Sequence, residues 1–320
     1  LREAIANKLK RENQLDYSFD QIVVSAGAKH SLANALLSII DKGDEVIVPA
    51  PYWVSYVEQV KLAEGKNVIV PTKIDNNFKI TPQQLKEAIT PRTKALMLCS
   101  PSNPTGSIYS RDELQEIAEV VAAAENDIYV ISDEIYEYIN FEGKHESIAQ
   151  FDIIKDKTII INGVSKGYAM TGWRIGYMAA SKEIATACAK LQGQVTSGAC
   201  SIAQRASFTA ITSDNDFTQE MNEAFIRRRD LVLEGLEQIN GMKKYTPNGA
   251  FYLFPDISYY FGKTDGNVTI ENDQELCFYL LDEANVALVP GSAFGSPENI
   301  RISYAASDDE LKEALSRIKI

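Results

Sequence analysis

Short runs of β-branched residues alternate with helical patterns through the first two thirds of the chain, and this alternation is the strongest constraint on the fold. Six runs have the composition of buried strands, at residues 44–50, 66–72, 94–100, 128–132, 157–163 and 173–180. Helix starts can be predicted between these runs. Thr81 with Gln84 and Ser110 with Glu113 have the pattern of capping boxes, and Pro82 occupies a first-turn position. The pattern predicts an α/β fold with a mostly parallel, mixed sheet flanked by helices.

The pattern changes after about residue 200. A long helical stretch from roughly Asp216 to Ile239 leads into short strand candidates at 249–254, 286–290 and 300–306, with helices near 274–284 and after Ser307. Ser307 with Glu310 caps the closing helix. We therefore expect a large domain over residues 1–226 and a smaller C-terminal α+β domain over residues 227–320.

The charge balance argues against two classes of partner. The chain has 44 Asp and Glu against 32 Lys and Arg, a formal net charge of −12, and its longest basic run is 227–229. An acidic protein without a basic patch is a poor match for nucleic acid or for an anionic membrane surface. Its apolar runs are also too short to span a bilayer.

The beginning of the chain is a charged helical stretch with Leu1, Ile5 and Leu9 on one face. It resembles neither a signal peptide nor a natural start, so we expect these 320 residues to be the inside of a longer protein.

The cysteines and histidines of the chain bear on its redox compartment and on the presence of a metal site. The four cysteines lie far apart, without a CxxC pair, in apolar contexts that favour buried thiols and a cytoplasmic address. Only His30 and His145 are present, and we expect each to be a surface or helix residue. We expect no metal site.

Ligands of open α/β sheets bind beyond the carboxyl ends of the strands. Four loops that follow predicted strands carry an aromatic ring, an amide, a carboxylate, a phenol, a hydroxyl and an amine, from Trp53, Asn103, Asp133, Tyr136, Ser165 and Lys166. Each has an ordinary structural explanation: a turn, a core anchor, a helix cap or a solvated lysine. Their joint position indicates a binding site for a flat, charged aromatic ring.

Four sequence blocks extend this interpretation: SPSNPTG from residue 100, SDEIYE from 132, GVSKGYAMTGWRIGY from 163 and RISYA from 301. In order and spacing they resemble the signature blocks of the fold-type I, class I and II pyridoxal-phosphate aminotransferases, above all the prokaryotic-type aspartate aminotransferases. The resemblance covers essentially the whole chain, and it implies a large cofactor-binding domain, a small C-terminal domain and transamination.

The resemblance implies a role for each residue around the cofactor ring. Lys166 would hold the cofactor aldehyde covalently and, once displaced by substrate, take the α-proton. Asp133 would stabilise the protonated ring nitrogen. Tyr136 and Asn103 would reach the phenolic oxygen, and Trp53 would stack on the ring.

The cofactor phosphate is expected at a helix start. Gly27 and Ala28 open the helical stretch SAGAKHSLANALLSII, and free N–H groups at its positive end would bind a dianion. Lys29 belongs to the same helix start, and we expect it to bind the cofactor as well. Ser165 would add a hydroxyl and Arg174 a planar fork.

The substrate side is implied by the resemblance as well. Arg301 matches the arginine that binds the substrate α-carboxylate, and Trp53 and Asn103 would also contact substrate. Lys29 aligns with a lysine that some prokaryotic-type aspartate aminotransferases use on the distal carboxylate. This favours L-aspartate with 2-oxoglutarate, while aromatic amino acids and prephenate stay open.

Two features bear on assembly. The family's N-terminal arm, which closes over substrate, has no counterpart in these 320 residues, so closure of the site is in doubt. Relatives build each site at a dimer interface, and the TSGACS segment, residues 196–201, is our candidate for crossing it. We therefore expect a homodimer with shared active sites.

Three rival functions remain to be weighed. Another pyridoxal-phosphate reaction on the same scaffold, such as C–S lysis by β-elimination or decarboxylation, uses the same lysine, aspartate and arginine. An aminotransferase-like sensor domain of a transcription regulator is a second rival, although the acidic balance offers no DNA footprint. A Ser-Lys hydrolase built on Ser165 and Lys166 is disfavoured, because adjacent residues of an extended segment point to opposite faces.

Overall fold

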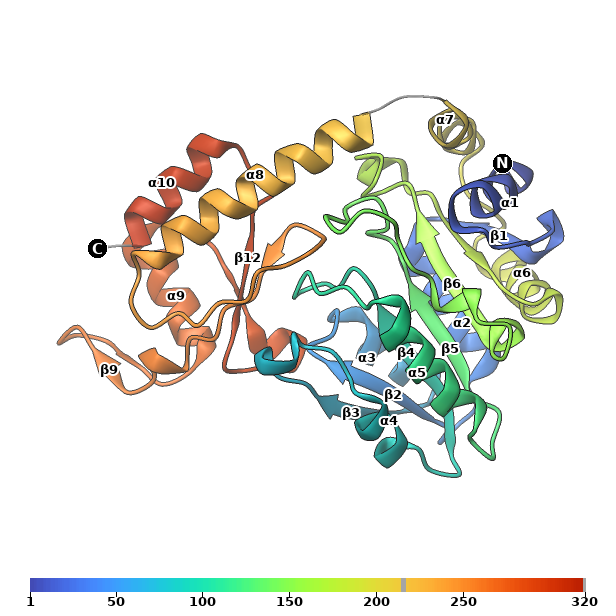
Figure 1. Ribbon diagram of the computed structural model, residues 1–320, viewed down its shortest axis with the longest axis horizontal. Helices are drawn as coiled ribbons and strands as arrows, with labels where there is room; N and C mark the ends of the chain where they lie inside the picture. Colours follow the sequence, from blue (N-terminus) through green and yellow to red (C-terminus); the bar gives the residue numbers. More distant parts are fainter. Residues whose placement is uncertain (214–216, 319–320) are drawn as a thin grey trace.

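The structure is a computed structural model that describes residues 1–213 and 217–318, and it has two parts (Figure 1). The larger part surrounds a seven-stranded sheet, and the smaller part contains α8 (Phe217–Glu237), α9 (Asp273–Ala284) and α10 (Asp308–Ile318). None of the described helices is long and apolar enough to cross a membrane.

The large sheet has the strand order β1-β7-β6-β5-β4-β2-β3. Its strands are β1 (Ile22–Ser25), β2 (Glu45–Ala50), β3 (Lys66–Pro71), β4 (Thr93–Cys99), β5 (Tyr129–Asp133), β6 (Thr158–Gly163) and β7 (Gly176–Ala179). Strand β7 alone runs opposite to the other six strands of this sheet, which confirms the predicted mostly parallel, mixed sheet.

Two strands differ from the sequence prediction. The strand predicted over 173–180 begins only at Gly176, because Arg174 has a left-handed φ of 55° that no strand accommodates. Strand β1 was not predicted, and its four residues at the sheet edge are too few for a clear periodic signal.

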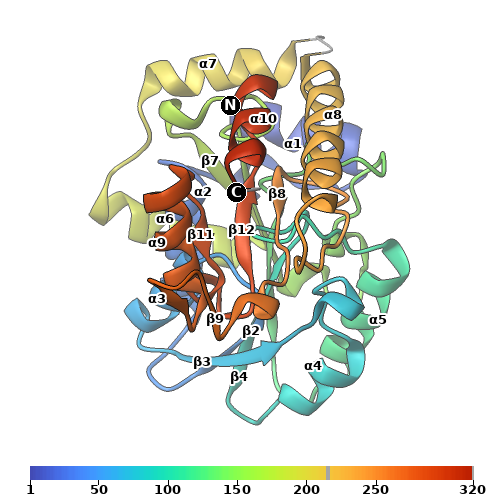
Figure 2. The ribbon, with the colours of Figure 1, turned by 90° about the vertical axis from the view of Figure 1, so that its left-hand side faces the viewer.

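Helices cover both faces of the sheet. One face packs against α2 (Ala28–Ile39), α3 (Ser55–Leu62) and α6 (Lys182–Val195) through a single apolar core. The other face packs against α4 (Pro82–Ala88) and α5 (Arg111–Ala122), and further along against α1 (Arg2–Lys8) and α7 (Ser201–Thr212). Figure 2 shows this layering from the side. Buried on both faces, the strands are near-continuous apolar runs.

The predicted helix starts are confirmed. Thr81 Oγ1 accepts a hydrogen bond from Gln84 N at 3.1 Å, and Ser110 Oγ accepts one from Glu113 N at 3.3 Å. Each glutamine or glutamate side chain accepts the cap residue's own N–H in return. These reciprocal bonds satisfy N–H groups that a helix start otherwise leaves free.

The smaller part is built on an antiparallel sheet of order β11-β12-β8, from Val289–Pro290, Ile300–Ser303 and Tyr252–Leu253. A two-stranded ribbon, β9 (Lys263–Thr264) with β10 (Thr269–Ile270), lies beside it. The expected long helix is α8, although its predicted start at Asp216 lies outside the described residues. The expected domain boundary between 226 and 227 falls inside this continuous helix.

The opening helix is more deeply buried than its charge suggests. Helix α1 continues into a π-helical turn, Leu9–Asn13, and both Ile5 and Leu9 are buried, as their shared face predicts. Lys8 is buried as well, which the apolar pattern did not anticipate.

The expectations for three single residues were wrong. His145 is neither on the surface nor in a helix, since it is buried in an irregular segment where its Nε2 lies 3.0 Å from Glu134 Oε2. Cys200 is exposed and Cys99 is half-buried, whereas Cys188 and Cys277 have the expected buried thiols.

Candidate active site

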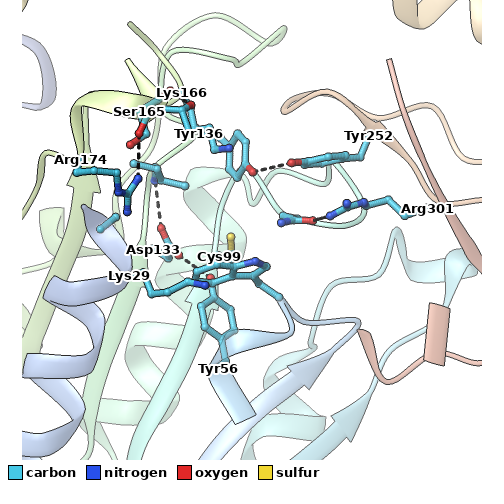
Figure 3. Close-up of a pocket in the computed structure, with 15 residues that line it drawn as sticks. Lys29, Tyr56, Cys99, Asp133, Tyr136, Ser165, Lys166, Arg174, Tyr252 and Arg301 are labelled. Atoms are coloured by element: carbon cyan, nitrogen blue, oxygen red, sulfur yellow. Dashed lines mark hydrogen bonds between the residues drawn. The ribbon is translucent and has the colours of Figure 1, made fainter. Parts of the chain in front are cut away.

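A cavity of about 330 Å³ opens where the carboxyl ends of the large-sheet strands face β8 and β12 (Figure 3). Every site residue predicted from the sequence lines it, with the exception of Gly27: Ala28, Lys29, Trp53, Asn103, Asp133, Tyr136, Ser165, Lys166, Arg174 and Arg301. The loops after β2, β4, β5 and β6 therefore do converge, as the strand-end rule predicts.

Asp133 is the last residue of β5 and is buried at the base of the cavity. Its Oδ2 accepts a hydrogen bond from Tyr56 Oη at 2.7 Å, and its Oδ1 accepts one from the N–H of Ile135 at 3.3 Å. No described lysine, arginine or histidine forms a salt bridge with it. Burial raises the pKa of Asp133 to about 6, against the opposing effect of the hydrogen bond from Tyr56. The cavity thus holds a carboxylate that lacks a cation.

Lys166 follows β6 and reaches the cavity from the wall above Asp133 (Figure 3). Its ammonium lies 5.7 Å from the ring centre of Tyr136 and 5.5 Å from that of Phe251. Burial, then the nearby charges of Arg301 and Arg174, lower the pKa of Lys166, while Asp133 opposes the change. The environment favours a neutral amine, which is the form that can act as a nucleophile or a base.

Aromatic side chains form the cavity's side and lower walls. Trp53 meets Tyr56 edge to face, with ring centres 5.5 Å apart. Tyr136 and Tyr252 share a hydrogen bond of 2.9 Å between their hydroxyl groups, which links the large sheet to β8. Trp53 and Tyr136 both line the cavity, and aromatic walls of this kind suit a planar ring.

One end of the cavity is shaped for an anion. Ala28 and Lys29 begin α2, where their N–H groups have no carbonyl partner within the helix. Arg174 lies against this helix start: a Cβ placed on Gly27, whose φ is +88°, would lie 2.2 Å from Arg174 Nη2. A Cβ on Gly176 would lie 2.1 Å from the nitrogen of Ala28. The two glycines therefore allow the guanidinium and the helix start to approach each other.

The opposite end holds a second group that lacks its partner. Arg301, on β12, donates from Nη1 to Asn103 Oδ1 at 3.0 Å, and its guanidinium lies over the rings of Tyr252 and Phe294 at 4.5 and 4.9 Å. Its Nε is buried without a hydrogen-bond acceptor. The described residues offer it no carboxylate, although a guanidinium fork matches a carboxylate with two parallel bonds.

Lys29 is exposed at the cavity mouth, and its ammonium lies 4.8 Å above the ring of Trp53. No described carboxylate forms a salt bridge with it. A cation held over an aromatic face but not neutralised is available to an anionic group of a ligand.

The sequence missed five residues that line the cavity: Tyr56, Cys99, Ile135, Thr171 and Tyr252. Tyr56 follows Trp53 by three residues at the start of a helix, and that spacing could have indicated a second ring on the same side. Tyr252 could not have been found, because its strand has only two residues and belongs to another sheet.

The premise used against a Ser-Lys pair was also wrong. Ser165 and Lys166 both line the cavity, because they lie in a turn and not in an extended segment. Even so, Ser165 Oγ and Lys166 Nζ form no hydrogen bond with each other, as a serine and its base would. Within the described ranges, no group of three or more His, Cys, Asp or Glu side chains could hold a metal ion.

Comparison with known proteins identifies the class. The family model for aminotransferase class I and II matches residues 1–318, so the chain belongs to this family and is an aminotransferase. It is 49% identical to the bifunctional aspartate aminotransferase and glutamate/aspartate-prephenate aminotransferase of Petunia hybrida, over 100% of this chain and 67% of the relative. It is 48% identical to the aspartate aminotransferase of Bacillus subtilis, over 100% of this chain and 80% of the relative.

The fold agrees with this assignment. The aspartate aminotransferase of Rhizobium meliloti superimposes with a TM-score of 0.96 at 45% identity, covering 99% of this chain and 80% of that one. The chain therefore spans about two thirds of the Petunia relative and about four fifths of the bacterial ones. The family and the sheet together confirm the fold type I architecture expected from the sequence.

Proposed function

We propose that this cavity binds pyridoxal 5'-phosphate on Lys166 and transfers the amino group between L-aspartate and 2-oxoglutarate. One observation carries the proposal: a single cavity holds a buried carboxylate without a cation, Asp133, and a half-buried guanidinium without a carboxylate, Arg301, on either side of the half-buried Lys166, as far as the described residues show. A cationic ring and a substrate carboxylate are the two missing partners.

The residues present fit the cofactor. The family implies pyridoxal phosphate, and the chemistry of the donor set agrees with it. Asp133 would face the ring nitrogen, and Trp53 would cover one ring face. Asn103 and Tyr136 would reach the phenolic oxygen. The phosphate would be held by the start of α2, from Gly27 to Lys29, together with Ser165 and Arg174.

Each residue has a task in the transfer. Bound pyridoxal phosphate supplies an aldehyde for the amino group and a protonated ring that withdraws electrons from the substrate α-carbon. Asp133 keeps the ring nitrogen protonated by stabilising its positive charge. Lys166, with its lowered pKa, takes the α-proton as a neutral amine. Arg301 orients the α-carboxylate by a bidentate pair, so that the α-hydrogen faces Lys166.

The substrate assignment rests on charge. Arg301 and Lys29 give the cavity two cations that no carboxylate of the described residues neutralises, which suits a dicarboxylate. The relatives' names agree, since those from Bacillus subtilis and Rhizobium meliloti are aspartate aminotransferases. The Petunia relative's name adds glutamate and prephenate, which are dicarboxylates as well.

A donor panel tests the assignment. Oxo-acid formation from aspartate, glutamate, alanine and phenylalanine is measured with 2-oxoglutarate or oxaloacetate as acceptor. We expect kcat/KM to be highest for aspartate and glutamate. Lys29→Ala should lower kcat/KM for aspartate about tenfold and leave that for alanine unchanged, because only the distal carboxylate meets Lys29. Faster turnover of phenylalanine than of aspartate would refute the dicarboxylate assignment.

We further propose a cytoplasmic homodimer with domains over residues 1–226 and 227–320. Exposed apolar side chains support the dimer: Trp173, Val195 and Ile202 are 48%, 66% and 74% exposed and lie before and around the 196–201 segment. Large apolar side chains that are exposed in the single chain would be covered at an interface. Light scattering of the purified protein, with Ile202→Asp as the variant that should dissociate it, tests the dimer.

A further inference from the structure

A buried polar cluster lies directly behind the candidate active site and lines no part of the cavity. It consists of Lys8, Asn13, Glu137 and Asn162, and we name it the anchoring cluster. The side chains of Lys8 and Glu137 are 1% and 5% exposed and form a direct ion pair. Burial of two charges opposes folding, and hydrogen bonds from neighbouring groups are needed to offset that cost. A buried ion pair is therefore weak evidence for a purely stabilising role.

The cluster joins three segments that are distant in sequence. Glu137 Oε1 accepts from Asn13 Nδ2 at 2.6 Å, and its Oε2 accepts from Asn162 Nδ2 at 2.8 Å. Lys8 also donates to Asn13 Oδ1 at 2.9 Å. The opening helix thereby contacts the loop after β5 and the end of β6 at one point.

Both of those segments carry active-site groups. Glu137 follows Tyr136 directly and is four residues from Asp133, while Asn162 precedes Ser165 by three residues and Lys166 by four. Asn162 Oδ1 also accepts the N–H of Gly163 at 2.7 Å, which fixes the backbone where β6 ends. Glu137 is thus the common acceptor that holds the Asp133 loop against the Lys166 loop.

A second connection runs parallel to the first. Tyr168 Oη donates to Tyr138 Oη at 3.0 Å, and Tyr138 Oη donates to Glu12 Oε2 at 2.5 Å. A Cβ on Gly167 would lie 2.5 Å from the Tyr138 ring, so the backbone beside Lys166 packs directly on that tyrosine. These residues again link the opening helix, the β5 loop and the β6 loop.

We propose that Lys8 and Glu137 are positioning residues, which fix the distance between the loop that carries Asp133 and Tyr136 and the loop that carries Ser165 and Lys166. The inference rests on the proposed function of that site. All four of these residues must meet one rigid ligand, so a small change in the separation of their loops weakens several contacts at once. Arg301 and Lys29 belong to other elements and are not held by the cluster.

The test distinguishes an effect on the position of the active-site loops from an effect on the stability of the fold. In Lys8→Met with Glu137→Met the buried charges are removed together, while Asn13 and Asn162 lose the acceptor of one hydrogen bond each. The cofactor-free double variant should therefore remain folded at the assay temperature but unfold below the wild-type temperature. Its dissociation constant for pyridoxal phosphate, from absorbance titration, should rise about tenfold or more, and kcat at saturating cofactor should fall by a similar factor. KM for aspartate should stay within about twofold, since Arg301 and Lys29 are unaffected.

The matched control is Glu45→Met with Arg92→Met. This pair lies at the amino end of β2, away from the cavity, and its carboxylate Glu45 is likewise buried, whereas Arg92 is exposed. Its removal should leave cofactor affinity and kcat unchanged. A Lys8 and Glu137 double variant that binds cofactor and turns over within twofold of wild type would overturn the proposal.

A second variant and the wild-type protein itself complete the test. Should the double variant not fold, Tyr168→Phe decides, because it removes one hydroxyl from the second connection: we expect about threefold weaker cofactor binding, and unchanged binding contradicts the proposal. Failure of the wild-type protein to bind pyridoxal phosphate would instead refute the proposed function.

Discussion

Two buried carboxylates, one at the end of β5 and one in the loop that follows it, have opposite environments. Asp133 and Glu137 are four residues apart, and both are almost fully excluded from solvent. Glu137 accepts hydrogen bonds from Lys8 and from the side-chain amides of Asn13 and Asn162. Burial alone would raise the pKa of Glu137, but the charge of Lys8 outweighs it, and the pKa is lowered to about 2. Asp133 receives one hydroxyl and one N–H, and burial raises its pKa to about 6.

The difference shows which carboxylate awaits a ligand. A structural acid is paired within the fold, because an unpaired buried charge opposes folding. An acid that remains under-paired in a cavity is a candidate for the site of chemistry. Residue type and burial are nearly the same in the two cases, so the partners decide the role.

The largest expected effect comes from Asp133→Asn. The amide can still accept from Tyr56, but it cannot stabilise a cationic ring, so kcat should fall about 10⁴-fold, as for other buried carboxylates that orient and stabilise a cation. Steady-state kinetics with aspartate and 2-oxoglutarate measure this. The cofactor-free variant should be at least as stable as wild type in urea unfolding at pH 7.5. A marked loss of stability would place Asp133 with the structural acids.

The matched change Glu137→Gln should affect the molecule in the opposite way. Lys8 would keep a buried charge whose nearest remaining carboxylate, the partly exposed Glu12, lies 3.6 Å away, and the loss of Glu137 should lower the free energy of unfolding by about 3 kcal/mol. Urea unfolding of the cofactor-free protein measures the loss. An unchanged midpoint would mean that the ion pair contributes no net stability and that the comparison with Asp133 fails.

The two acids should also differ in how they couple stability to pH. The pKa of Asp133 is raised from 3.8 to about 6, so its contribution to stability is full below pH 3.8 and is lost as pH rises through 6. The pKa of Glu137 is lowered from 4.5 to about 2, so its contribution is full above pH 4.5 and is lost as pH falls toward 2.

Urea unfolding of the cofactor-free protein at pH 5.0 and 7.5 distinguishes them. Relative to Asp133→Asn, the wild type should be about 1.5 kcal/mol more stable at pH 5.0 than at pH 7.5. Equal differences at the two pH values would mean that the Asp133 carboxyl titrates normally.

The smallest expected effect comes from Tyr56→Phe, which removes the one side-chain hydrogen bond that Asp133 accepts from the described residues. The pKa of Asp133 should rise further and kcat should fall about 3- to 10-fold at neutral pH, with partial recovery as pH rises. A pH profile of kcat for this variant is the measurement. A profile that coincides with wild type would show that Tyr56 does not tune the carboxylate.

The sequence predicted the sheet and most of the cavity because both follow from local patterns. Strand-length apolar runs, capping residues and the strand-end rule together placed Asp133, Lys166 and Asn103 at one edge. The sequence could not predict which side chains contact each other across long stretches of the chain. That Lys8 is buried against Glu137, and that Tyr136 meets Tyr252, depends on contacts 129 and 116 residues apart along the chain. Such contacts leave no periodic signal in the sequence.

The central claim is that the cation missing from Asp133 is the ring of a cofactor held by Lys166. Borohydride reduction of the protein with saturating pyridoxal phosphate, followed by digestion and peptide mass measurement, tests it directly. We predict a pyridoxyl mass on the peptide that contains Lys166, in wild type and in Asp133→Asn alike, since attachment needs the amine and not the carboxylate. An unmodified Lys166 in the wild-type protein would contradict the account.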